Sequence, residues 1–341
     1  MKRHKNIPVF IPHLGCPNNC VFCNQRKISG TMCFNRENVN NEIKEALKTV
    51  NPKTDEVQIA FFGGSFTGID REDMIYLLEI ANRYIKNGEV DSVRLSTRPD
   101  YIDEEILDIL KAYGVKTIEL GLQSMSDKVL LASGRGHSAK CSREACKLIK
   151  NYGFELIGQM MTALPKSTPE DEIFTANELL KMKVDGARIY PTMVFAGTEL
   201  ENMAKSGSYQ VPTLENLISR TADAFSVFAE NNIPVIRIGL QSSDGLGDEN
   251  GIVLSPYESA MGEMVISEYY FKKIAKLLDE YPKGFLIGKN LQIFCHPGEI
   301  SKIVGQHKLN KMKINTIYGM NNIKLLEKST IMLYNVLINV C

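Results

Sequence analysis

Three cysteines near the start of the chain have the spacing and the chemistry to hold a metal cluster. Cys16, Cys20 and Cys23 follow one another as C-x3-C-x2-C in one short segment. Such a segment presents three thiolates from a single loop, and thiolates are the usual ligands of iron–sulfur clusters. A four-iron cluster is normally saturated by four thiolates, so three cysteines would leave the fourth iron open to another ligand.

Zinc is the main alternative for these cysteines. Sites of three cysteines and one histidine exist, and His13 lies three residues before Cys16. Structural zinc motifs usually contain a second closely spaced cysteine pair, which this chain lacks. The other cysteines are scattered, and we interpret them as structural or incidental: Cys33, Cys141, Cys146, Cys295 and Cys341. The spacing alone favours an iron cluster and leaves zinc open.

The composition predicts a globular protein with no net charge. The chain has 341 residues, 44% of them hydrophobic, which is enough for one large α/β barrel or two domains. Forty basic residues balance forty acidic ones, so net charge neither indicates nor excludes a polyanionic partner. Eight cysteines without a hydrophobic signal segment predict a reducing, cytoplasmic environment. No apolar run reaches the roughly 18 residues of a membrane span, so we expect no membrane association.

Up to about residue 240, β-branched apolar runs alternate with segments of helical periodicity. The expected strands are residues 9–11, 57–62, 93–97, 117–122, 155–161 and 186–190. The expected helices are residues 37–50, 71–85, 103–112, 138–151, 169–182 and 214–231. This alternation predicts six parallel βα units, in an open barrel or a doubly wound sheet.

Several expected strands end in polar or glycine residues. Gly63, Gly64 and Ser65 follow the second strand, Ser96 ends the third, and Gln123 follows the fourth. Parallel α/β folds bind ligands at the C-terminal edges of their strands, so we expect these residues to meet the cysteines there. Tight turns, capped strand ends and hydrogen bonds to backbone would explain the same residues without a ligand.

Two further polar residues are candidates for ligand contacts. Arg135 lies between glycines just before an expected helix, where its guanidinium could pair with a carboxylate. Gln159 lies inside the apolar run of the fifth strand, where burial is costly without a partner. A surface position for Arg135 and a core hydrogen-bond network for Gln159 are the alternatives.

The C-terminal part differs from the βα pattern. Residues 239–251 are polar and rich in glycine, which predicts a linker or long loop and divides the chain into a core domain, 1–250, and an extension, 251–341. The extension has one clear helix, at 261–279. Residues 301–328 carry His307 and a single acid, Glu327, among six lysines: Lys302, Lys308, Lys311, Lys313, Lys324 and Lys328. This basic segment predicts RNA contact, although a solvated lysine-rich face is an equal alternative.

Taken together and in order, the motifs resemble the radical S-adenosylmethionine (SAM) domain of the Elongator catalytic subunit. The matching strings are FGGSF at 62–66, TRPD at 97–100, ELGLQS at 119–124, RGH at 135–137, IYPT at 189–192 and GTEL at 197–200. More distantly, they resemble oxygen-independent coproporphyrinogen oxidase. The resemblance covers roughly residues 7–240.

This resemblance implies a fold, a cofactor set and residue roles. The fold would be α/β, a partial (β/α)6 TIM-like barrel of radical SAM type with a small C-terminal α+β extension. Cys16, Cys20 and Cys23 would ligate a 4Fe-4S cluster whose open iron binds SAM. The cofactor-binding residues would be Gly63, Gly64, Ser65, Ser96, Gln123, Arg135 and Gln159. The coproporphyrinogen enzymes have acidic residues where this chain has Ser96 and Gln159.

The resemblance also implies a reaction and partners. The expected enzyme cleaves SAM reductively and abstracts hydrogen from a substrate in tRNA modification, with an electron donor such as flavodoxin or ferredoxin. The residues after Gly251 are too few for the acetyltransferase domain of the Elongator subunit, so its acetyl-CoA chemistry does not carry over. The alternatives are a small-molecule or tetrapyrrole-type substrate, or a cluster-bearing RNA-binding protein without catalysis.

Overall fold

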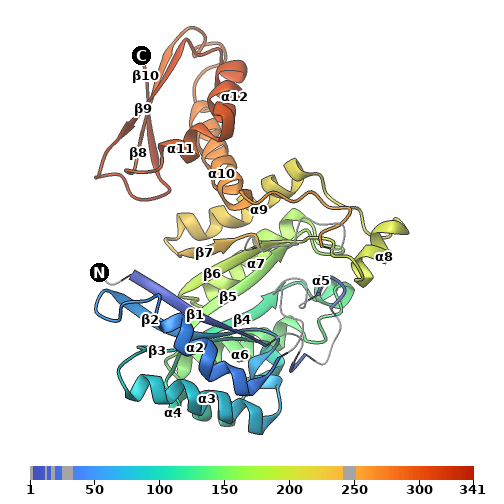
Figure 1. Ribbon diagram of the computed structural model, residues 1–341. Coiled ribbons are helices and arrows are strands. Elements are labelled where there is room, and N and C mark those ends of the chain that lie inside the picture. Colours follow the sequence, from blue (N-terminus) through green and yellow to red (C-terminus); the bar gives the residue numbers. More distant parts are fainter. Residues whose placement is uncertain (1–2, 12–13, 17–19, 25–33, 241–250) are drawn as a thin grey trace.

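The computed structural model describes residues 3–11, 14–16, 20–24, 34–240 and 251–341. Its main sheet contains seven parallel strands in sequential order, which curl into an open half-barrel (Figure 1). These strands are β1 (Arg3–Ile11), β2 (Asp55–Gly63), β3 (Ser92–Thr97), β4 (Val115–Gln123), β5 (Glu155–Thr162), β6 (Gly186–Pro191) and β7 (Val235–Ile238). His13, Cys33 and most of the glycine-rich stretch at 239–251 lie outside the described residues.

Helices cover the convex side of this sheet. They are α2 (Val39–Leu47), α3 (Arg71–Lys86), α4 (Glu104–Ala112), α6 (Ala139–Asn151), α7 (Pro169–Lys181) and α9 (Leu214–Glu230), with the shorter α5 (Asp127–Ala132) and α8 (Glu199–Lys205) near the strand ends. Side chains cap the N-termini of several of these helices. The Asp70 carboxylate accepts two backbone N–H bonds at the start of α3, and Thr168 forms a capping box with Asp171 at the start of α7.

The partial barrel expected from the sequence is confirmed, but the count of six strands was too low. The missed strand, β7, has only four residues, and Arg237 interrupts its apolar character. It lies at the edge of the sheet and pairs only with β6. A strand this short and half-exposed carries too little hydrophobic periodicity to be recognised from sequence.

The two faces of the main sheet differ in chemistry. Alternate residues point to opposite faces, and in β4 Ile118, Leu120 and Leu122 are fully buried hydrophobic side chains in the core. Two residues that alternate with them, Thr117 and Glu119, belong to a hydrogen-bonded network on the concave face. The half-barrel therefore has an apolar outer layer under the helices and a polar interior.

The C-terminal residues form a second, smaller unit. Helix α10 (Met261–Leu278) packs against α9 and leads to a three-stranded sheet of order β10-β8-β9 (Figure 1). Its strands are β8 (Asn290–Cys295), β9 (Asn322–Glu327) and β10 (Val336–Val340), and its helices are α11 (Ile300–Val304) and α12 (Leu309–Tyr318). The expected α+β extension is confirmed, whereas the exact division at residue 250 stays a prediction.

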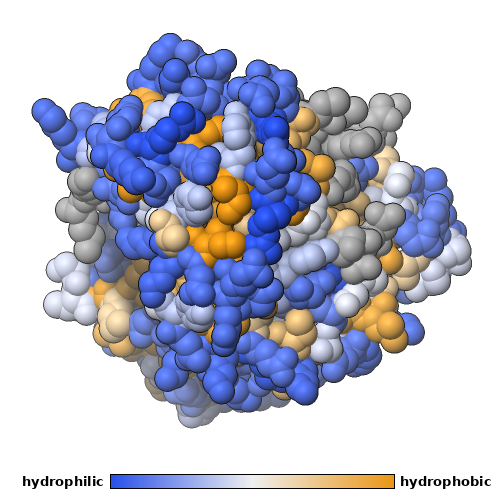
Figure 2. Space-filling model, turned by 90° about the horizontal axis from the view of Figure 1, so that it is seen from below, coloured by the Kyte–Doolittle hydropathy of each residue, from blue (hydrophilic) through white to orange (hydrophobic). Residues whose placement is uncertain are grey.

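The outer surface is hydrophilic because the amphipathic helices turn their polar sides to the solvent. Viewed from below, the molecule is mostly hydrophilic, with hydrophobic side chains confined to small patches (Figure 2). In the part of the chain that the structure describes, no helix combines the length and the apolar character that crossing a bilayer requires.

Candidate active site

A cavity of about 120 Å³ opens at the C-terminal edge of the main sheet. Nine of the ten site residues expected from the sequence line it: Cys16, Cys20, Cys23, Gly63, Gly64, Ser96, Gln123, Arg135 and Gln159. They come from the ends of four strands, from the cysteine loop and from the segment before α6. Parallel strands end at one edge of a sheet, so residues up to 143 positions apart in sequence meet here.

The start of the cysteine loop packs directly on the glycine turn after β2. A Cβ atom on Gly15 would lie 2.2 Å from the Ser65 carbonyl oxygen, and one on Gly64 would lie 2.1 Å from the Leu14 carbonyl oxygen. The Gly64 N–H donates to the Ile11 carbonyl at 2.7 Å, and the Ser65 N–H to that of Leu14 at 3.1 Å. Glycine is needed on both sides because the two backbones touch.

The far end of the cysteine loop is anchored to elements much later in the chain. The Val21 N–H donates to the Ser133 carbonyl at 3.1 Å, and the Leu200 N–H donates to the Val21 carbonyl at 2.8 Å. Phe22 is buried in a small apolar cluster that includes Leu164 and Tyr209. The loop that carries the three thiols is therefore tied to α5 and α8 as well as to β2.

Two buried arginines surround the Cys20 thiol. Arg135 Nη1 lies 3.2 Å and Arg98 Nη1 lies 3.9 Å from Cys20 Sγ. Burial raises the pKa of the Cys16 thiol, while the nearby charges of Arg98 and Arg135 oppose that increase. A cationic environment favours the thiolate form, which is the form that binds iron. Among the described residues, no three histidine, cysteine or acidic side chains converge as a metal site, so the ligand roles stay predictions.

Polar atoms without partners in this cavity fit a polar ligand. Gln123 Oε1 and Arg135 Nε are buried and have no hydrogen-bond partner among the described residues. Such orphaned atoms are costly, so they indicate a missing acceptor for the arginine and a missing donor for the glutamine. Gln123 also has a left-handed backbone, with φ of 66°, which re-aims its side chain at the end of β4. The cavity thus suits a ligand that offers both a hydrogen-bond acceptor and a hydrogen-bond donor.

Ser65 is the one expected site residue that does not line the cavity. Its hydroxyl is buried and lies 3.0 Å from the Thr97 hydroxyl, which in turn lies 2.6 Å from that of Thr67. This hydroxyl chain joins the turn after β2 to the end of β3. A contact between Ser65 and a ligand would therefore involve its backbone.

Gln159 belongs to a charged network inside the half-barrel. Its Nε2 donates to Glu119 Oε2 at 3.0 Å, and Glu119 is only 1% exposed. Arg94 and Arg188 also bind this carboxylate, with contacts of 2.8 Å each. The network alternative for Gln159 is therefore realised, although its side chain also lines the cavity. Through this bond the Glu119 carboxylate fixes the orientation of the Gln159 amide.

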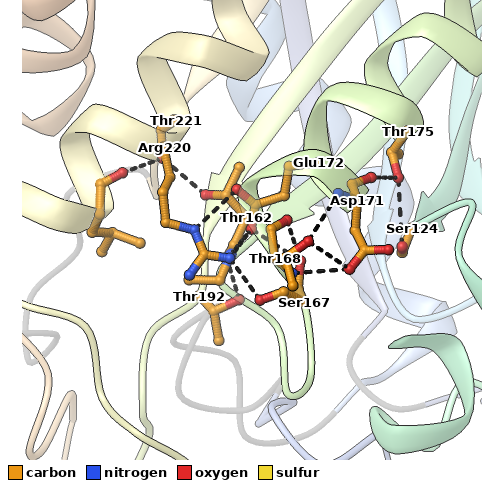
Figure 3. Close-up of polar contacts among 12 residues, drawn as sticks. Ser124, Thr162, Ser167, Thr168, Asp171, Glu172, Thr175, Thr192, Arg220 and Thr221 are labelled. Atoms are coloured by element: carbon orange, nitrogen blue, oxygen red, sulfur yellow. Dashed lines mark hydrogen bonds and ion pairs between the residues drawn. The ribbon is translucent and has the colours of Figure 1, made fainter. Parts of the chain in front are cut away.

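A second group of polar residues lies between β5, α7 and α9 (Figure 3). Arg220 donates to the buried Glu172 at 2.5 and 3.2 Å, and Glu172 also accepts from the Ala163 N–H at 2.6 Å. The Thr162 and Thr221 hydroxyls are 2.8 Å apart. This carboxylate is saturated by protein donors, so the group fixes the loop after β5 and does not suggest a ligand.

Sequence reasoning selected neither Arg98 nor Glu119 as a site residue. Arg98 donates from Nε and Nη2 to the two carboxylate oxygens of Asp100, both at 2.9 Å. Its Nη1 is then left to contact Cys20 Sγ. The sequence did contain a signal for Arg98, because a residue that precedes proline is held in an extended conformation and Arg98 precedes Pro99 at the end of a strand. For Glu119 the signal was an acid inside an apolar strand, which requires buried cationic partners.

Comparisons with known proteins agree with this architecture. The family model described as the radical SAM superfamily matches residues 10–179, and the model described as the radical SAM C-terminal domain matches residues 184–270. An uncharacterized protein of Methanocaldococcus jannaschii is 30% identical over 283 residues, which cover 80% of this chain and 83% of that protein.

Elongator complex protein 3 of Saccharomyces cerevisiae is 30% identical over 199 residues. The match covers 52% of this chain and 36% of the yeast protein, so the chain spans about a third of that relative's length. Among solved structures, the archaeal Elongator protein 3 of Methanocaldococcus infernus, with an N-terminal deletion, superposes with a TM-score of 0.61 at 20% identity. That superposition covers 81% of this chain and 64% of the archaeal one, and it shows a shared fold.

Proposed function

Because the chain belongs to the radical SAM superfamily, whose members are enzymes, we propose that it cleaves SAM reductively to modify tRNA. Cys16, Cys20 and Cys23 would hold a 4Fe-4S cluster, and the cavity beside them would hold SAM. The single observation that carries this proposal is the pair of orphaned polar atoms, Gln123 Oε1 and Arg135 Nε, in the cavity that the three cysteines line.

When both cofactors are bound, they supply the chemistry of the family, in which one electron splits SAM into methionine and a 5′-deoxyadenosyl radical that takes a hydrogen atom from the substrate. The protein's own residues would bind and orient SAM and the substrate. Arg135 would pair with the carboxylate of SAM, and Gln123 would accept a hydrogen bond from an N–H group. Gly63 and Gly64 would bring backbone groups close to the ligand, beside Ser65 and Ser96. Gln159 donates one amide N–H to Glu119, so its second N–H and its carbonyl oxygen would be the groups that could face the ligand.

The tRNA substrate rests on the resemblance to the Elongator catalytic subunit and on the lysine-rich extension. A small-molecule or tetrapyrrole-type substrate is the alternative. We also propose a cytoplasmic location, because a cluster site with reduced thiols and a donor such as flavodoxin or ferredoxin need a reducing compartment.

Anaerobic reconstitution with iron and sulfide tests the cofactor proposal. After addition of dithionite and SAM, we expect 5′-deoxyadenosine from the wild type and none from Cys20→Ala. Cys141→Ala is the matched control, because Cys141 lies on α6 outside the cavity and should retain the activity. A wild-type protein that takes up zinc in place of iron, or that cleaves no SAM, contradicts the proposal.

Bulk tRNA then tests the substrate. We expect a nucleoside of changed mass, detected by mass spectrometry of digested tRNA, that depends on SAM and on Cys20. Unchanged tRNA together with consumption of a tetrapyrrole would replace the preferred substrate by the alternative.

A further inference from the structure

The small C-terminal sheet has one covered face and one open face. Helices α10, α11 and α12 lie on one side of the sheet (Figure 1). On that side Leu291, Ile293 and Cys295 of β8 are buried. The residues that alternate with them, Gln292 and Phe294, point to the other side and are partly exposed. The open face of the sheet therefore presents a partly exposed aromatic ring, Phe294, on its central strand β8.

An apolar row crosses the open face at Phe294. In the strand register, Phe294 pairs with Leu337 of β10 on one side and with Leu326 of β9 on the other. Leu337 is 60% exposed. The ammonium group of Lys328 lies 3.9 Å from the centroid of the Phe294 ring. A flexible lysine can leave the ring for a phosphate, and the aromatic surface is then available for stacking.

A polar row runs beside the apolar one. Gln292 pairs in register with Asn339 and Lys324 on its two sides, and Asn339 Nδ2 donates to Gln292 Oε1 at 3.3 Å. Amide groups can donate to and accept from the edges of unpaired bases. Lys324 is exposed at the end of this row and adds a second positive charge.

The charge of residues 282–341 favours a polyanion. Residues 282–341 contain eight lysines, no arginine and two acids, in a chain whose net charge is zero. One of these acids, Glu299, is buried and bonded to Tyr270 and Lys302. The other, Glu327, accepts a hydrogen bond from the Gly298 N–H. Positive charge therefore exceeds negative charge in residues 282–341, although Lys302 pairs with Glu299 and Lys313 pairs with Glu268 of α10.

We infer that the open face of the sheet β10-β8-β9 binds unpaired nucleotides of an RNA. A base would stack on Phe294, Gln292 would face its edge, and Lys324 and Lys328 would contact phosphates. This inference deepens the proposed function and rests on its RNA substrate, since it names the surface that would hold the tRNA while one nucleotide reaches the cavity. A protein partner fits less well, because the apolar row is narrow and bordered by lysines.

Fluorescence anisotropy with the full chain tests the inference. The probes are a labelled single-stranded oligouridine of about 12 nucleotides and a duplex RNA of the same length. Phe294→Leu keeps the apolar volume but removes the aromatic surface, and should weaken oligouridine binding roughly 5- to 150-fold while changing duplex binding little. Lys324→Ala/Lys328→Ala should lower the slope of log affinity against log salt by about 1.4 for oligouridine, since each phosphate contact to a single strand contributes about 0.7.

The matched control is Lys53→Ala/Lys86→Ala, which removes two exposed lysines near β2 and α3, far from the small sheet. It should bind RNA as the wild type does. If the wild type binds RNA and the sheet variants bind equally well, the inference is wrong while the tRNA proposal stands. If the wild type binds neither these probes nor bulk tRNA, the RNA substrate itself is wrong, and SAM cleavage then tests the cofactor proposal separately.

Discussion

Arg135 Nη1 donates to Cys20 Sγ at 3.2 Å, although 115 residues separate the two in sequence. The same guanidinium donates through Nη2 to the Gly121 carbonyl at the end of β4, at 2.5 Å. The backbone bond from Val21 to Ser133 brings the two segments together. One arginine therefore joins the cysteine loop, the edge of the sheet and the cavity, and its buried Nε has no partner among the described residues.

Replacing this arginine should impair SAM binding more than folding. We expect Arg135→Gln to reduce SAM affinity by roughly 10- to 150-fold, because a charged hydrogen bond contributes about 1.5–3 kcal/mol. Equilibrium dialysis with SAM on the reconstituted protein measures this loss. Arg143→Gln is the control, since Arg143 pairs with Glu178 on α7, away from the cavity, and its loss should leave SAM affinity unchanged. Equal affinities in all three proteins would remove Arg135 from the site.

Loss of the buried carboxylate inside the half-barrel should destabilise the protein strongly. Glu119→Ala leaves Arg94 and Arg188 with uncompensated buried charges, and we expect a loss of about 3–5 kcal/mol in the free energy of unfolding. Urea unfolding followed by circular dichroism provides the value. Glu45→Ala removes an exposed partner of Lys48 and should cost less than about 1 kcal/mol. Similar losses in the two variants would mean that the network contributes little to stability.

The contact between the cysteine loop and the glycine turn can be tested with a single methyl group. Gly64→Ala places a Cβ 2.1 Å from the Leu14 carbonyl oxygen, so the loop must shift, at a cost of about 1–3 kcal/mol. We expect iron content after reconstitution to fall well below that of the wild type. Gly88→Ala, where the added Cβ meets no atom within 4 Å, should bind iron normally despite its φ of +72°. A Gly64→Ala protein with full iron content would show that the loop tolerates the shift.

One histidine should make stability depend on pH. Burial, assisted by the charge of Arg135, lowers the pKa of His137 to about 4 from 6.5. Between these two pH values the unfolded chain binds a proton that the folded protein does not, so stability is complete above about pH 6.5 and decreases as the pH falls to about 4. Urea unfolding measures the free energy of unfolding at each pH. Between pH 6.5 and pH 4 we expect this free energy to decrease less in His137→Gln than in the wild type, by up to about 3 kcal/mol. Identical pH profiles would show that His137 titrates alike in both states.

Local sequence was sufficient for most of the fold. Apolar periodicity located six of the seven strands of the half-barrel, and helical periodicity located the long helices that cover it. Only β7, with four residues and an internal arginine, lacked enough periodicity. The clustering of the expected site residues could also be predicted from the sequence. Parallel strands place their C-terminal ends at one edge of the sheet, so cysteines, glycines and polar residues at those ends become neighbours.

Tertiary structure decided what each polar residue contacts. The sequence by itself determined the cysteine spacing, the positions of most strands and the residues at the strand ends, because these depend on neighbours along the chain. The sequential order of the strands in the sheet came from the tertiary structure. Sequence left open whether Gln159 faced a ligand or a core network, and folding placed Glu119 against it from a neighbouring strand. In the same way, Arg98 and Arg135 reach Cys20 only because the chain folds back over 78 and 115 residues. Such contacts depend on backbone placement in three dimensions, which no local pattern encodes.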